Sequence, residues 1–149
     1  MGIRAALDAL VDIEETLAIT SPVAQSIAQV YKYTPRQDAA LVAPCVLNII
    51  ESSEEMRTVT GLGRMTYRLR IQLFVAEPGL DQAQDIALAY HEALWDLLRA
   101  RTAAAQTLAG VAVLQRNLAS GPMPIRLTWN ERAYIGIEQT LDLIIDGSE

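Results

Sequence analysis

The chain has 149 residues and a formal net charge of −6, with 12 Lys and Arg residues against 18 Asp and Glu residues. This balance argues against tight, sequence-independent binding to a phosphate backbone, which needs clustered basic residues. The single cysteine, Cys45, cannot form an intramolecular disulfide. A chain of this length buries enough surface to fold as one domain, residues 1–149, without a metal.

The N-terminal sequence Met1-Gly2-Ile3-Arg4 lacks the basic and then apolar segments of a secretory signal peptide. No run of about 18 apolar residues is present, so the sequence predicts no membrane-spanning helix and no membrane partner. We therefore expect the protein to be made and assembled in a cytoplasm.

The N-terminal part of the chain is predicted to hold one helix and two strands. Apolar residues recur at helical spacing over residues 3–18 and predict an amphipathic helix that ends before Ser21-Pro22. Residues 27–34 are expected to form a short strand, and residues 45–50 are expected to form a second one.

The central strand of the fold is predicted at residues 66–75. Its odd positions, from Tyr67 to Val75, are apolar and its even positions are mostly polar, which is typical of a strand with one buried face. The preceding residues, 51–64, exceed a usual hairpin loop of about two to five residues. They are expected to form either a protruding β-hairpin arm with Gly61-Leu62-Gly63 near its tip or a mobile loop.

The C-terminal part is predicted to hold one long helix and three strands. Apolar residues at helical spacing predict the helix over residues 82–101. Strands are expected at residues 111–116 and 125–129, and a long strand at residues 135–145 is expected beside the central one. These elements predict an α+β fold: a mixed, mainly antiparallel sheet with two principal helices packed on one face and a long protruding β-hairpin arm.

No cluster of residues predicts catalysis, a metal site or a cofactor. His91 is the only histidine and lacks partners at ligand spacing, so we interpret it as a solvated or half-buried helix residue. Cys45 lies in an apolar strand, where cysteine is usually inert. Gly61-Leu62-Gly63 precedes a strand instead of a helix, which does not fit a dinucleotide-binding turn. The neighbouring carboxylates are interpreted as solvated charges: Asp12, Glu14, Glu15, Glu54 and Glu55.

The candidate contact residues are charged residues on the sheet face away from the helices. Arg68 and Arg70 are expected to share this face with Glu138 and Asp142 of the last strand. The sequence leaves two interpretations open: a hydrated face with cross-strand ion pairs, or a self-complementary surface that meets another subunit. The predicted arm adds five candidates for contact with another subunit or with another protein: Glu54, Glu55, Met56, Arg57 and Arg64.

The order of these elements resembles the tail terminator, or tail completion, proteins of long-tailed bacteriophages. The similarity covers nearly the whole chain. It rests on the opening amphipathic helix, the proline-led segment 43–50, the long hairpin into residues 67–75, the single helix at residues 82–101, and the C-terminal strand at residues 134–145.

This resemblance implies a virion structural protein without catalytic residues or a cofactor. The family forms a ring, usually hexameric, that caps the finished tail tube, stops polymerisation of the tube protein and offers a docking surface to the head connector. The candidate contact residues would then meet another subunit or the tail tube. The implied location is the head–tail interface of the virion, after assembly in the host cytoplasm, with DNA passing through the lumen without specific binding. A net charge of −6 fits a lumen that repels DNA phosphate over about 8–10 Å.

Three other interpretations stay open at this point. A neck or head-completion adaptor belongs to the same class and has a similar size. From other classes, the chain could be a small regulatory or ligand-binding α+β domain, or an enzyme, which the sparse site chemistry disfavours. Particle mass and imaging separate these classes, because a ring supports the tail terminator or the adaptor, and a stable monomer or dimer supports the small regulatory or ligand-binding domain.

Overall fold

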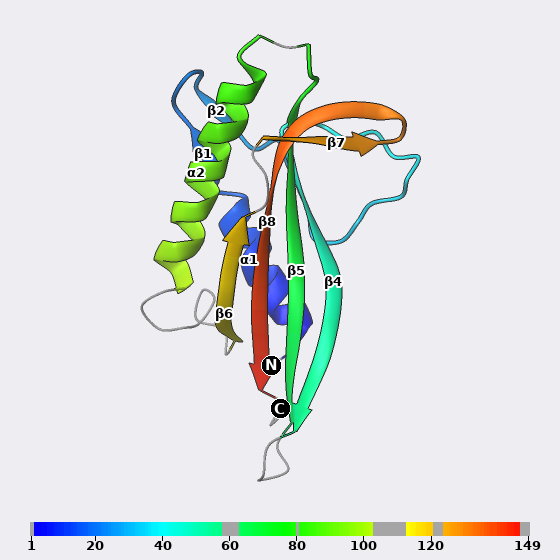
Figure 1. The fold of residues 1–149 in the computed structure, drawn as a ribbon, viewed down its shortest axis with the longest axis vertical. Coiled ribbons are helices and arrows are strands. Elements are labelled where there is room, and N and C mark those ends of the chain that lie inside the picture. Colours follow the sequence, from blue (N-terminus) through cyan, green and yellow to red (C-terminus); the bar gives the residue numbers. More distant parts are fainter. Residues whose placement is uncertain (1, 58–62, 80, 103–112, 121–123, 147–149) are drawn as a thin grey trace.

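A computed structural model describes residues 2–57, 63–79, 81–102, 113–120 and 124–146. It has the α+β fold that the sequence predicts, with a mostly antiparallel mixed sheet and two helices (Figure 1). In chain order the elements are α1 (Ile3–Glu14), β1 (Ala18–Ile19), β2 (Gln25–Ser26), β3 (Gln29–Tyr31), β4 (Cys45–Arg57), β5 (Gly63–Ala76), α2 (Ala83–Thr102), β6 (Val113–Ser120), β7 (Ile125–Trp129) and β8 (Arg132–Asp146).

Strand β5 is the centre of the main sheet, whose order is β3–β4–β5–β8–β6, with β7 paired to β8. The β3–β4 pair is parallel, and β4, β5, β8 and β6 alternate in direction. The prediction that the last strand lies beside the central strand is therefore confirmed. A separate two-stranded sheet joins β1 to β2. Because Ala18 and Ile19 belong to it, α1 ends at Glu14 and does not reach residue 18.

The hairpin between β4 and β5 is the part of the predicted fold that is not confirmed. Most of the segment expected as an arm or loop is regular strand, because β4 continues to Arg57 and β5 begins at Gly63. Strand β8 runs beside β5 as far as Arg64, which lies opposite Asp146. A hairpin that projects free of the sheet is therefore not confirmed. The expected tip at Gly61 lies outside the described residues.

The alternating pattern of β5 decides which sheet face is buried against the helices. Its odd residues Leu69, Ile71 and Leu73 are all fully buried. They belong to one core cluster with α1, α2, β4 and β8, so both helices cover the same face. The principal helix residues in this cluster are Leu7, Leu10, Ile13, Ile86, Tyr90, Leu94 and Leu98.

The opposite face of the sheet has two unlike halves. Near β7, in the upper half of Figure 1, a second cluster of Cys45, Leu47, Phe74, Leu127 and Tyr134 is buried. The segment between β3 and β4 and the strand β7 cover it, and Trp129 Nε1 donates a hydrogen bond of 2.8 Å to the Ala39 carbonyl. Only the half away from β7 keeps the polar face that the alternation predicts.

The hairpin between β7 and β8 turns through two residues with positive φ, Asn130 at 48° and Glu131 at 64°. This backbone favours Asn-Gly, because a side chain other than asparagine or aspartate is strained there. We expect Glu131→Gly to raise the free energy of unfolding by about 0.5–1 kcal/mol. Denaturant unfolding tests this, with Glu131→Ala as a control that should give no gain. A glycine variant no more stable than the alanine variant would contradict the expectation.

Candidate functional site

The half of the outer sheet face away from β7 carries the candidate contact residues. We call it the polar sheet face. It comprises Glu51, Glu54, Thr66, Arg68, Arg70, Gln72, Glu138, Thr140 and Asp142. The register places Arg68 opposite Asp142, Arg70 opposite Thr140 and Gln72 opposite Glu138. The sequence predicted that Arg68, Arg70, Glu138 and Asp142 share one face, and the pairing of β5 with β8 confirms it.

Cross-strand contacts tie these side chains together within one chain. Arg68 Nε lies 3.0 Å from Asp142 Oδ1, and Arg68 Nη2 lies 3.4 Å from Asp142 Oδ2. The hydrogen bond to Asp142 raises the pKa of the Arg68 guanidinium. Arg70 Nη2 donates to Glu51 Oε1 over 3.3 Å. The structure therefore contains the cross-strand ion pairs of the first interpretation, in which Arg68 and Glu51 are exposed and Asp142 is buried. Contact with another subunit stays a prediction.

The remaining charge on this face comes from Glu54 and Glu138. Gln72 Nε2 donates a hydrogen bond of 2.9 Å to Glu138 Oε2, whereas Glu54 is exposed opposite Thr66. Among the side chains that the structure describes, the face thus carries four carboxylates, Glu51, Glu54, Glu138 and Asp142, and two guanidinium groups, Arg68 and Arg70. This excess of acids is local and agrees in sign with the net charge of the chain.

The other predicted contact residues lie at the far end of the β4–β5 hairpin. Glu55 is exposed and lies opposite Met65. It is the residue after Glu54, so the alternation of the strand places it on the other side from the polar sheet face. Met56 lies opposite Arg64, and Arg57 lies opposite Gly63. The structure brings Glu54, Arg68, Arg70, Glu138 and Asp142 onto one face, and it leaves Glu55 on the alternate side of the ladder.

A buried polar pair that the sequence reading missed joins α1 to the sheet. Glu14 is completely buried, so its interpretation as a solvated charge is wrong. Asn48 Nδ2 donates to Glu14 Oε1 over 2.6 Å and to the Tyr31 carbonyl over 3.2 Å. The signal was available, because Glu14 lies four and seven residues after Leu10 and Leu7 and so shares their helix face.

Burial raises the pKa of Glu14 to about 8, and the hydrogen bond from Asn48 offsets this only in part. Glu14 Oε2 and Asn48 Oδ1 find no hydrogen-bond partner among the residues that the structure describes. A protonated carboxyl supplies an O–H donor, whereas an ionised one leaves a charge in the core. The pair is therefore a structural link between α1 and β4 that prefers the neutral acid.

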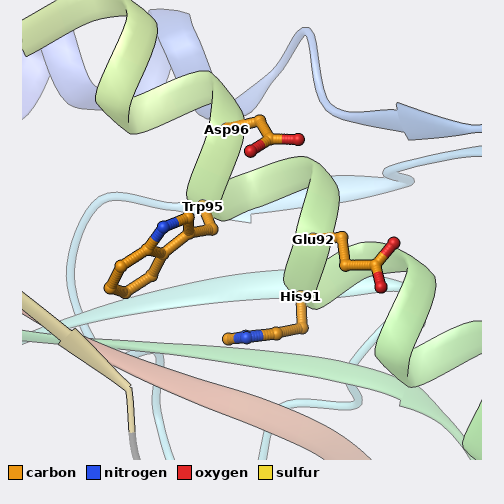
Figure 2. Close-up of a pocket in the computed structure, with 4 residues that line it drawn as sticks. All are labelled: His91, Glu92, Trp95 and Asp96. Carbon is orange, nitrogen blue, oxygen red and sulfur yellow. The ribbon is translucent and has the colours of Figure 1, made fainter.

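A shallow pocket of about 280 Å³ lies on α2 and is lined by His91, Glu92, Trp95 and Asp96 (Figure 2). The His91 and Trp95 rings lie 6.2 Å apart, and the Glu92 and Asp96 side chains point away from them. The buried Gln139 Nε2 lies 3.1 Å from both His91 Nδ1 and the His91 carbonyl oxygen. His91 is half-buried and held by the sheet, in agreement with its prediction as a helix residue.

Cys45, the other residue considered as a candidate site, has a structural role. Cys45 is fully buried, and burial raises the pKa of its thiol to about 12, as expected of an inert cysteine. Among the described residues, no group of three or more His, Cys, Asp and Glu side chains is placed to hold a metal ion. No helix in the described ranges is both long enough and apolar enough to cross a bilayer.

Neither a protein-family model nor a curated protein matches this sequence. The fold and the contacts above therefore carry the functional argument.

Proposed function

We propose that the protein is a virion structural protein, a tail terminator whose copies form a ring on the end of a phage tail tube. The observation that supports this most is the polar sheet face: among the described residues no helix packs on this half of the sheet on one side, while α1 and α2 bury the other side. A sheet face with paired charges, of which Arg68 and Glu51 are exposed and Asp142 is buried, suits contact with other copies and with a passing polyanion.

In this proposal the ring stops polymerisation of the tube protein and offers its far side to the head connector. The candidate contacts to neighbouring copies or to the tube are the polar sheet face and the end of the β4–β5 hairpin, which together contain Glu54, Glu55, Met56, Arg57, Arg64, Arg68, Arg70, Glu138 and Asp142. DNA would pass through the lumen without specific binding. The acidic excess on the polar sheet face supports passage, because like charge opposes adhesion of phosphate within about a Debye length.

The test combines particle mass by light scattering, negative-stain imaging and binding to purified tail tubes. We expect a ring that binds tube ends and stops their elongation when added to polymerising tube protein. A ring that binds tail-less heads and ignores tubes would instead identify a neck or head-completion adaptor. A stable monomer or dimer that binds neither would contradict the proposal and favour a small ligand-binding domain.

A further inference from the structure

Within the described part of the chain, the main sheet has an edge without a partner strand on each side. Strand β3 pairs with β4 only from Cys45 to Leu47. Beyond that point the described residues place no strand on the outer side of β4, and residues 50–54 are all exposed. Ile50, a large apolar residue, is 42% exposed on this edge. At the other end of the strand order, β6 pairs only with β8 within the described part of the chain.

The two uncovered edges lie at the same level of the sheet. Strand pairing aligns Ser52 of β4 with Arg68 of β5, Arg68 with Asp142 of β8, and Asp142 with Asn117 of β6. The same chain of partners aligns Glu54 with Leu114. The part of β4 beyond its pairing with β3 and the strand β6 therefore lie at opposite edges of the sheet, at the same level along the strands (Figure 1).

Both edge strands, β4 and β6, also have a break in their pairing register close to the level of Ser52 and Asn117. The β4–β5 register shifts between Ile50 and Ser52, and the β6–β8 register shifts between Gln115 and Asn117. A residue inserted in this way bends its strand and increases its twist. Bulges on edge strands usually discourage pairing with another chain, so a partner that bends at the same height suits these edges better than a straight strand does.

The strand directions allow the sheet to continue from one copy into the next. Strands β4, β5, β8 and β6 alternate in direction, so β6 runs antiparallel to β4. If β6 of one copy lies beside β4 of the next, the sequence of directions continues without a break. The new ladder is antiparallel, the pairing in which backbone hydrogen bonds lie perpendicular to the strands.

We propose that copies of this chain associate edge to edge, with β6 of one copy paired to β4 of its neighbour, and that repetition of this contact closes the ring. The occupant of each edge is thus a second copy, joined head to tail through two different surfaces. Only the closure into a ring rests on the proposed function. Because α1 and α2 thicken one side of the sheet, curvature away from them turns the polar sheet face toward the lumen.

Cysteine pairs across the two edges test this arrangement in the full-length chain. Ser52→Cys is combined in turn with Gln115→Cys, Asn117→Cys and Ala119→Cys, which samples the register on both sides of the matching level. A disulfide needs Cα atoms about 4.4–6.8 Å apart, so it reports strand adjacency and not general proximity. The matched control is Ser26→Cys combined with Asn117→Cys, because Ser26 is an exposed serine on β2, away from both edges.

We expect mild oxidation of at least one pair to give a ladder of linked chains on a non-reducing gel, up to the size of the ring, and the control to give none. Rings that are seen by imaging but never linked by any pair would overturn the edge contact and leave the proposed function standing. Linked rings that do not bind tube ends would support the edge contact and overturn the proposed function. Dimers from Ser52→Cys alone would show β4 against β4 and overturn the head-to-tail arrangement, and an unlinked monomer would overturn both proposals.

Discussion

Replacing Glu14 by glutamine is expected to stabilise the fold at pH 8 and to remove a pH dependence from its stability. Burial raises the pKa of Glu14 from 4.5 to about 8, so between these values the unfolded chain releases a proton that the folded chain keeps. The free energy of unfolding of the natural chain therefore falls as the pH rises through this window, by up to about 1.4 kcal/mol per pH unit, and levels off above it.

The glutamine side chain has nearly the same shape and cannot ionise, so it removes the cost of a buried charge. The expected gain over the natural chain is close to zero below pH 4.5 and reaches several kcal/mol, as an order of magnitude, near pH 8. Denaturant unfolding at pH 4, 6 and 8 measures it. Neutral glutamine can still accept the hydrogen bond from Asn48, so the link between α1 and β4 is retained.

The control for this prediction is Glu15→Gln, which removes a carboxylate from the next position of the chain, where the side chain is exposed. This variant should keep the pH dependence of the natural chain. If Glu14→Gln keeps it as well, Glu14 is ionised in the folded protein at neutral pH, and the reading of the buried pair is wrong.

Replacing Gly136 by alanine is expected to destabilise the fold by about 3 kcal/mol, at the upper end of the cost of overpacking. A Cβ at this position would collide with the Leu73 carbonyl oxygen and would lie 2.7 Å from Leu127 Cδ1. Gly136 lies opposite both Phe74 and Ile125, where β8 pairs with β5 on one side and with β7 on the other. Backbone atoms of β5 cannot move away without breaking this ladder.

Thermal or denaturant unfolding of Gly136→Ala measures the cost. The control is Gly79→Ala, since a Cβ at Gly79 would meet no atom within 4 Å. That variant should change the free energy of unfolding by no more than about 0.5 kcal/mol, as surface substitutions usually do. Equal stabilities for the two variants would show that β5 and β8 approach each other less closely than the structure has them.

Much of the fold follows from periodicity. The alternation in residues 66–75 and 135–145 assigns each residue of β5 and β8 to one face, and this assignment holds along both strands. It holds because a strand has a period of two whatever its partner, so the face is a local property. The helices over residues 3–14 and 83–102 were predictable for the same reason, with a period near 3.6.

The extent of the strands and the surroundings of single polar residues were not predictable in this way. Strand β4 runs on through polar residues Ser52 to Glu55 because β5 pairs with it there, not because its own sequence alternates. Likewise, the apolar cluster around Phe74 and Tyr134 forms only where β7 and the segment after β3 fold back over the sheet. Partners far apart in the chain decide both features.

The sequence alone determined the α+β class, the two helices, the central strand and the shared face of Arg68, Arg70, Glu138 and Asp142, since each depends on repeats within one segment. Only the tertiary structure decided that Arg68 lies opposite Asp142, that Glu14 is buried against Asn48, and that β4 and β6 expose their edges at one level. These facts depend on register and packing between distant segments, which the periodicity of a single segment does not encode.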